Sequence, residues 1–170
     1  RRIVADRSGD LWFLPAGQRE EKESAAGKTS PYRIWRYSSS YSQGSFKAVE
    51  IPCGPASDLL YAQDRSRWLA TDQGLLWISA SQEDFRIYTE AQGLRSSRIW
   101  AIAEASDGAI WVCYDPSAAS GVTRIHEGEI RTFDERDGLA SPNARSVACA
   151  VSPEGSDVWF GTDRGIIRFD

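Results

Sequence analysis

The sequence contains no methionine, a single histidine and three cysteines. Because an initiator methionine is missing, we expect a processed chain or a piece of a longer polypeptide. The odd number of cysteines and the spacing of Cys53, Cys113 and Cys149 match neither a disulfide framework nor a Cys-x-x-Cys metal signature. Cys113 and Cys149 fall in apolar segments, so we expect them to be buried as small hydrophobic side chains.

An excess of positive charge and a long apolar run are also missing. The net charge is −4, which weighs against non-specific binding to nucleic acid. No apolar segment reaches the roughly 18 residues of a membrane-spanning helix. Residues 1–6 lack the apolar region of a secretory signal. We therefore expect no nucleic-acid partner and no membrane contact by this segment.

Catalytic motifs are scarce. There is no Gly-x-Ser-x-Gly elbow and no phosphate-binding loop. The single histidine, His126, falls at the tip of a predicted hairpin, where a solvated turn residue is the simpler interpretation. Paired carboxylates such as Glu83-Asp84 fall in loops or at strand ends, which favours a solvated face over a glycosidase pair. We expect no catalytic residue, no cofactor and no metal.

What the chain does have is seven tryptophans and a segment that occurs twice. Residues 68–79 and 159–170 share the order aromatic-apolar, small, Thr-Asp-x-Gly and an apolar pair. Gly74 and Gly165 are the turn glycines of the two copies. Asp72 and Asp163 also recur, and we interpret them as Asx-turn residues with a structural role.

Four Trp-apolar pairs divide the chain, and they begin at Trp12, Trp68, Trp111 and Trp159, about 43 to 56 residues apart. Between these pairs the third unit is the clearest, with strands predicted over 98–105, 109–114, 121–126 and 129–134. Its inner strands are apolar at consecutive positions, so both of their faces must be covered.

Four short antiparallel strands per repeat, covered on both faces, predict an all-β fold, a β-propeller. We expect a single propeller segment with four blades over about 1–56, 57–97, 98–144 and 145–170, the last one incomplete. Residues 16–31 form a predicted loop in the first blade. A partial, unclosed ring is the favoured interpretation, and a closed four-bladed ring is the alternative.

In such a fold the loops between second and third strands open on the same face as the crossovers between blades. Polar and aromatic residues on this loop-rich face are the candidate ligand-binding residues: Arg95, Arg98, Tyr114, Asp115, Asn143 and Arg145. Arginine and aromatic rings suit carboxylates and sugars. Arg98 and Arg145 open successive first strands and are candidates to line the channel; alternatively they only neutralise nearby carboxylates.

The repeats resemble the two-component-regulator propeller family, found in the sensor regions of bacterial hybrid histidine kinases. The pattern of residues 158–169, Val-Trp-Phe-Gly-Thr-Asp-Arg-Gly-Ile-Ile-Arg-Phe, carries the resemblance, and residues 97–112 fit well. It implies a non-catalytic, ligand-sensing segment in the periplasm or outside the cell. Its partners would be further blades and signalling modules of the same polypeptide, with a carbohydrate as a possible ligand. A protein-binding scaffold, or part of a propeller lyase or hydrolase, are the alternatives.

Overall fold

The computed structural model describes residues 2–6, 9–15, 32–38, 44–81, 83–139, 141, 143–152 and 155–169. The predicted loop over residues 16–31 falls outside these ranges. Strands dominate the described residues, and the helical segments are two single-turn 3₁₀ helices. Within the same ranges, no helix has the length and apolar character needed to cross a membrane.

The strands form four separate antiparallel sheets, each built from consecutive strands. The first contains β1 (Arg2–Ala5), β2 (Leu11–Leu14), β3 (Tyr32–Ser38) and β4 (Ser45–Ile51). The second contains β5 (Ala56–Tyr61), β6 (Arg67–Thr71), β7 (Leu75–Ile78) and β8 (Phe85–Tyr88). The third contains β9 (Ile99–Glu104), β10 (Ile110–Tyr114), β11 (Val122–His126) and β12 (Glu129–Phe133). The fourth has three strands, β13 (Ala144–Ser152), β14 (Gly155–Thr162) and β15 (Gly165–Phe169).

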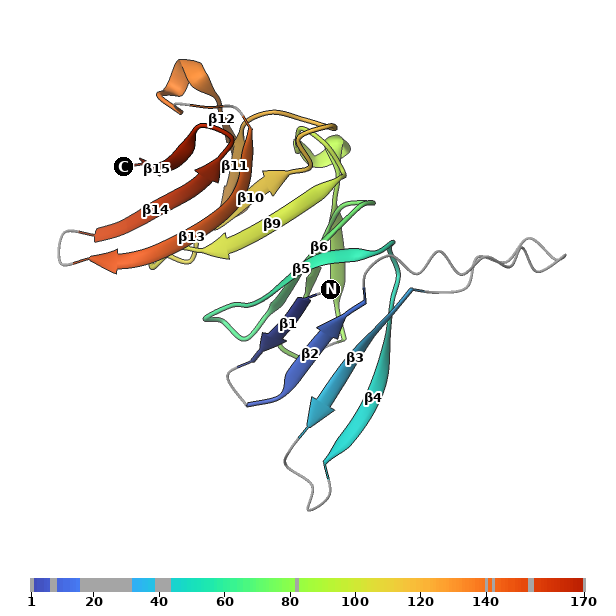
Figure 1. Ribbon diagram of the computed structural model, residues 1–170. Helices are drawn as coiled ribbons and strands as arrows, with labels where there is room; N and C mark the ends of the chain where they lie inside the picture. The colour runs from blue at the N-terminus through green and yellow to red at the C-terminus, as the bar shows by residue number, and fades with distance from the viewer. Residues whose placement is uncertain are drawn as a thin grey trace, which may run out of the picture.

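The sheets follow one another in an arc, with the first and the fourth at its two ends (Figure 1). The first strands of successive sheets, β1, β5, β9 and β13, lie next to one another along this arc. Among the described residues, the first and fourth sheets lie at opposite ends of this arc, so the ring is open (Figure 1). The predicted all-β class and the partial, unclosed propeller are therefore confirmed.

Three hydrophobic clusters fill the three spaces between neighbouring sheets. Trp12, Trp68 and Trp111 stand at equivalent positions of their sheets, and each is less than a tenth exposed. In the second sheet, Leu69 packs toward the first sheet while Trp68 packs toward the third. Alternate residues of one strand thus enter different clusters, which explains the apolar runs of the inner strands. Trp159 is 37% exposed because no described sheet covers its face.

Threonine, and not aspartate, makes the repeated Thr-Asp-x-Gly turn. The hydroxyl of Thr71 donates to the carbonyl of Gly74 at 2.6 Å and accepts the amide of Gln73 at 3.1 Å. Thr162 makes the same two bonds in the fourth sheet. The Asx-turn interpretation of Asp72 and Asp163 is therefore wrong. A hydroxyl closes the turn, which leaves the carboxylate that follows it available for other contacts.

The two later crossovers between sheets each begin with a capped 3₁₀ turn. Thr89 caps η1 (Glu90–Gln92) and Asp134 caps η2 (Glu135–Asp137), each through a capping box. A glycine with positive φ ends both turns, and the leucine that follows, Leu94 or Leu139, is buried. The two crossovers consequently enter the next sheet in the same way.

A β-bulge recurs where three of the first strands begin. In the second sheet Ala56 pairs with Thr71 and Asp58 with Ala70, so Ser57 has no partner of its own. Trp100 is the extra residue between β9 and β10, and Arg145 is the extra residue between β13 and β14. A bulge leaves one residue outside the ladder and changes the direction of its side chain.

Candidate functional site

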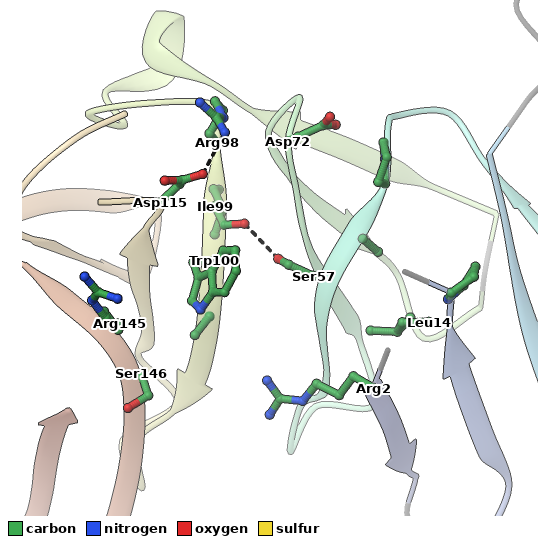
Figure 2. A pocket seen from close by; sticks show the side chains of 14 residues that line it. Arg2, Leu14, Ser57, Asp72, Arg98, Ile99, Trp100, Asp115, Arg145 and Ser146 are labelled. Carbon is green, nitrogen blue, oxygen red and sulfur yellow. Dashed lines mark hydrogen bonds and ion pairs between the residues drawn. The ribbon is translucent and has the colours of Figure 1, made fainter. Parts of the chain in front are cut away.

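The bulges open onto a cavity of about 590 Å³. We call it the axial cavity because the first strands of the sheets contribute most of its wall. Its lining consists of Arg2, Leu14, Pro15, Pro55, Ala56, Ser57, Asp72, Arg98, Ile99, Trp100, Ala101, Asp115, Arg145 and Ser146. Figure 2 shows that these side chains come from all four sheets and face a common space. The volume lies in the range of small-molecule sites.

The middle level of the axial cavity consists of the three bulge residues. Ser57 donates from its hydroxyl to the Ile99 carbonyl at 2.8 Å, which ties the second sheet to the third. Trp100 is 51% exposed although both of its neighbours in sequence are buried. Arg145 has no hydrogen-bond or ion-pair partner among the described residues. An indole face and a guanidinium are therefore both open to the cavity (Figure 2).

The upper level is a rim of charged residues. Arg98 donates to the Asp115 carboxylate at 2.7 Å and to the Ser117 hydroxyl at 3.3 Å. The backbone amide and the hydroxyl of Ser117 also donate to Asp115. These bonds, with the Arg98 charge as a smaller contribution, lower the pKa of Asp115. Asp72 extends the rim on the second sheet (Figure 2).

The deeper level is anchored by an ion pair between the first and second sheets. Arg2 lies 2.8 Å from the carboxylate of Asp58, whose side chain is only 2% exposed. Asp58 also accepts the backbone amides of Leu59 and Ile102. Burial raises the pKa of Asp58, and the Arg2 charge and these amides oppose that shift. Asp58 thus links three first strands beneath the site.

Three of the predicted site residues line the axial cavity: Arg98, Asp115 and Arg145. The strand pairing shows, however, that Arg98 and Arg145 are not equivalent residues, as the sequence had suggested. Arg98 and Asn143 are equivalent, because the backbone amide of each donates to the hydroxyl of the serine two residues earlier, Ser96 or Ser141. Arg145 is instead equivalent to Trp100, since both are bulge residues. Arg98 also forms the predicted neutralising contact with a carboxylate while it lines the cavity.

The other three predicted residues lie away from the axial cavity. Tyr114 is 1% exposed, and its hydroxyl lies 2.6 Å from the Thr123 hydroxyl and accepts the Arg95 amide. The Arg95 guanidinium donates to the Ser120 carbonyl at 3.0 Å. These contacts fasten the crossover to the third sheet. Asn143 donates to Asp163 at 2.9 Å, in the place that the Arg98–Asp115 pair occupies one sheet earlier.

Trp100, Ser57 and Asp72 were not among the site residues predicted from the sequence. Trp100 lies in the motif Arg-Ile-Trp-Ala-Ile, which is typical of a buried strand. A bulge depends on how two strands pair, so no local pattern marks it. The available signal was that Trp100 falls outside the four Trp-apolar pairs and therefore lacks their packing role.

The axial cavity is lined by guanidinium, indole, hydroxyl and carboxylate groups. Within the described part of the chain, no cluster of His, Cys, Asp and Glu side chains is arranged to hold a metal ion. His126 lies at the end of β11, outside the lining of the cavity. No cysteine belongs to the lining either, and burial raises the pKa of Cys53 and raises the pKa of Cys149 to about 11. Guanidinium, indole, hydroxyl and carboxylate groups remain, which together recognise polar ligands.

Comparison with known proteins agrees with this architecture. Residues 93–115, which include Arg98, Trp100 and Asp115, match the family model described as two component regulator propeller. The extracellular domain of BT3049, assigned to a hybrid two-component system of B. thetaiotaomicron, has a TM-score of 0.70 at 19% identity. The extracellular domain of BT4673, assigned to a one-component system of the same organism, has a TM-score of 0.63 at 17% identity.

A virginiamycin B lyase from Staphylococcus aureus, crystallised as an inactive variant with quinupristin, has a TM-score of 0.62 at 17% identity. The match covers 99% of this chain and 54% of the lyase. For the two extracellular domains it covers 99% and 97% of this chain but only 21% and 20% of theirs. No curated protein matches the sequence. At these identities the structures establish the fold, a partial β-propeller, and residues 93–115 are similar to a two-component-regulator propeller repeat.

Proposed function

We propose that the whole chain is one segment of the extracytoplasmic sensor propeller of a bacterial signalling receptor. We further propose that it is non-catalytic and that it binds a polar small molecule or an oligosaccharide in the axial cavity. One observation carries the proposal: the segment that matches the family model supplies Arg98, Trp100 and Asp115 to the cavity. Binding would stabilise one arrangement of the blades over others, which is how a sensor without chemistry transmits a signal.

The outer faces of the end sheets support a place within a longer polypeptide. Ile3, Trp35 and Phe46 are 62%, 42% and 64% exposed on the first sheet. Trp159 and Ile166 are 37% and 79% exposed on the fourth. Equivalent faces of the inner sheets are covered by the next sheet. We propose that further blades of the same polypeptide cover both ends and that signalling modules follow them.

A binding screen with the 170-residue chain tests the proposed function. Neutral and acidic oligosaccharides are added, and calorimetry measures binding while chromatography of the mixture detects any product. We expect binding without turnover, and the variant Arg98→Ala should weaken it. Exposed Arg33, which pairs with Glu50 away from the cavity, supplies the control variant Arg33→Ala. Product formation would instead favour the propeller-enzyme alternative.

A further inference from the structure

We propose that Trp100 and Arg145 form a binding site for a hydroxylated ring that carries one carboxylate, a sugar acid. This inference rests on the proposed function, because it specifies the ligand of the same axial cavity. It starts from the recurrent bulge, which places one side chain from each of three sheets at the same level of the cavity. Two of these three side chains, those of Trp100 and Arg145, are exposed and belong to none of the hydrophobic clusters between the sheets.

Trp100 supplies a flat apolar face. Its neighbours Ile99 and Ala101 are 3% and 6% exposed, whereas Trp100 itself is 51% exposed. The bulge therefore turns a large apolar side chain out of the intersheet clusters and into the cavity (Figure 2). Exposure of so much indole in a concave site is the arrangement that stacks on the face of a ring.

Arg145 supplies the positive charge. Arg2 and Arg98 also line the cavity, but each is held by a carboxylate at 2.8 Å or 2.7 Å. Arg145 has no such partner among the described residues, and it lines the same cavity as Trp100 (Figure 2). A guanidinium binds a carboxylate through two parallel hydrogen bonds. Arg145 is thus the arginine of the cavity that can pair with an added anion.

The rim restricts the ligand further. Asp72 and Asp115 border the same cavity, and their carboxylates repel a ligand with several negative charges. The same oxygens accept hydrogen bonds from hydroxyl groups. A ring with hydroxyl groups and a single carboxylate satisfies all of these groups. A phosphorylated ligand does not, because its second charge would face the rim.

Titration calorimetry with the 170-residue chain tests this assignment, using D-glucuronate and D-galacturonate as probes. D-glucose and D-galactose serve as neutral analogues, and benzoate serves as an acidic ring without hydroxyl groups. We expect the uronates to bind at least about tenfold more tightly than the neutral sugars, because hydrogen bonds to a charged group are stronger than those to a neutral group. Benzoate should bind more weakly than the uronates.

Two variants separate the contributions of the site. Arg145→Gln should remove the preference for uronates over neutral sugars, and Trp100→Ala should weaken both about tenfold. Arg33→Gln and Trp35→Ala are matched controls, since both residues are exposed outside the cavity. Near-ultraviolet circular dichroism verifies the fold of each variant.

The outcomes distinguish this inference from the proposed function. Binding of neutral sugars as tightly as uronates, with no effect of Arg145→Gln, would overturn the sugar-acid assignment but leave a polar-ligand sensor. Tighter binding of benzoate would assign the site to aromatic acids and overturn it too. If none of these probes and no larger oligosaccharide binds, both proposals fail.

Discussion

The Arg2 guanidinium on β1 lies 2.8 Å from the Asp58 carboxylate on β5, so an ion pair joins two first strands beneath the axial cavity. Asp58 is almost fully buried, while Arg2 is 51% exposed. The Asp58 carboxylate is therefore shielded from water, whereas the Arg2 guanidinium remains hydrated. Its contribution to stability depends mainly on the protonation state of Asp58.

Replacing Arg2 with methionine should destabilise the chain by about 1–2 kcal/mol at neutral pH, since solvent screens the exposed partner. Burial already raises the pKa of Asp58 in the folded state. The Asp58 contribution to stability is therefore fully present below its unfolded pKa, near 3.8, and is lost as pH rises through its folded pKa. Loss of Arg2 raises the folded pKa further, so the effect of Arg2→Met should grow from pH 4 to pH 7.

Urea unfolding of both proteins at these two pH values measures the difference. Arg33→Met, which breaks the exposed pair with Glu50, is the control and should have less than about 1 kcal/mol of effect at either pH. An effect of Arg2→Met that is independent of pH would contradict this account.

The threonine of the repeated turn should matter more than the aspartate that follows it. Thr71 is fully buried and makes two hydrogen bonds within the turn. Thr71→Val should therefore reduce the free energy of unfolding by about 1–2 kcal/mol. Asp72 is exposed, so Asp72→Ala should change it by less than about 0.5 kcal/mol. Equal losses measured by chemical denaturation would restore the Asx-turn interpretation.

Alanine should be less tolerable at Gly74 than at Gly165. Both residues have positive φ, 134° and 115°, which a side chain strains. A Cβ at Gly74 would also lie 2.7 Å from the Tyr88 carbonyl, whereas none would meet an atom within 4 Å at Gly165. We expect losses of about 2–4 kcal/mol for Gly74→Ala and about 1–2 kcal/mol for Gly165→Ala. Thermal or urea unfolding compares the pair, and the reverse order would show that contact with β8 is unimportant.

The thiols should react slowly and in a defined order. Burial raises the pKa of Cys113 strongly, and Cys113 is completely buried in the cluster between the third and fourth sheets. Cys149 is partly exposed and has a pKa of about 11. Since the thiolate is the reactive form, iodoacetamide labelling of Cys149 should accelerate about tenfold per pH unit between pH 8 and pH 10.

Cys113 should be labelled only as fast as the chain unfolds. Mass spectrometry of tryptic peptides follows both sites, with the urea-unfolded chain as the reference for full reactivity. Labelling of Cys113 before Cys149 in the folded chain would mean that the cluster between the third and fourth sheets opens locally.

The sequence predicts the sheets well because its signals are local. Asp-Gly turns and Trp-apolar pairs placed the strands of the third sheet within about one residue of their observed bounds. Consecutive apolar residues around Trp111 required cover on both faces, and the structure provides it. These features can be recognised in the sequence without knowing which distant residues come into contact.

The candidate site was predicted only in part because its geometry depends on pairing between strands. Arg98, Asp115 and Arg145 reach the axial cavity as residues of the loop-rich face. Tyr114 does not, since it occupies the position that Thr71 has in the second sheet and points into the core. Trp100 was missed because the bulge changes the direction of its side chain. The register between two strands cannot be predicted from the sequence of one strand alone.

At the bulge, selection for ligand binding and selection for stability act on different residues. Trp100 and Arg145 belong to no hydrophobic cluster, so substitutions there leave the packing between sheets unchanged. Three of the four repeats therefore carry one position at which a substitution can change recognition without changing the hydrophobic clusters of the scaffold. Duplication of a repeat would add another such position, and new binding preferences could be assembled one blade at a time.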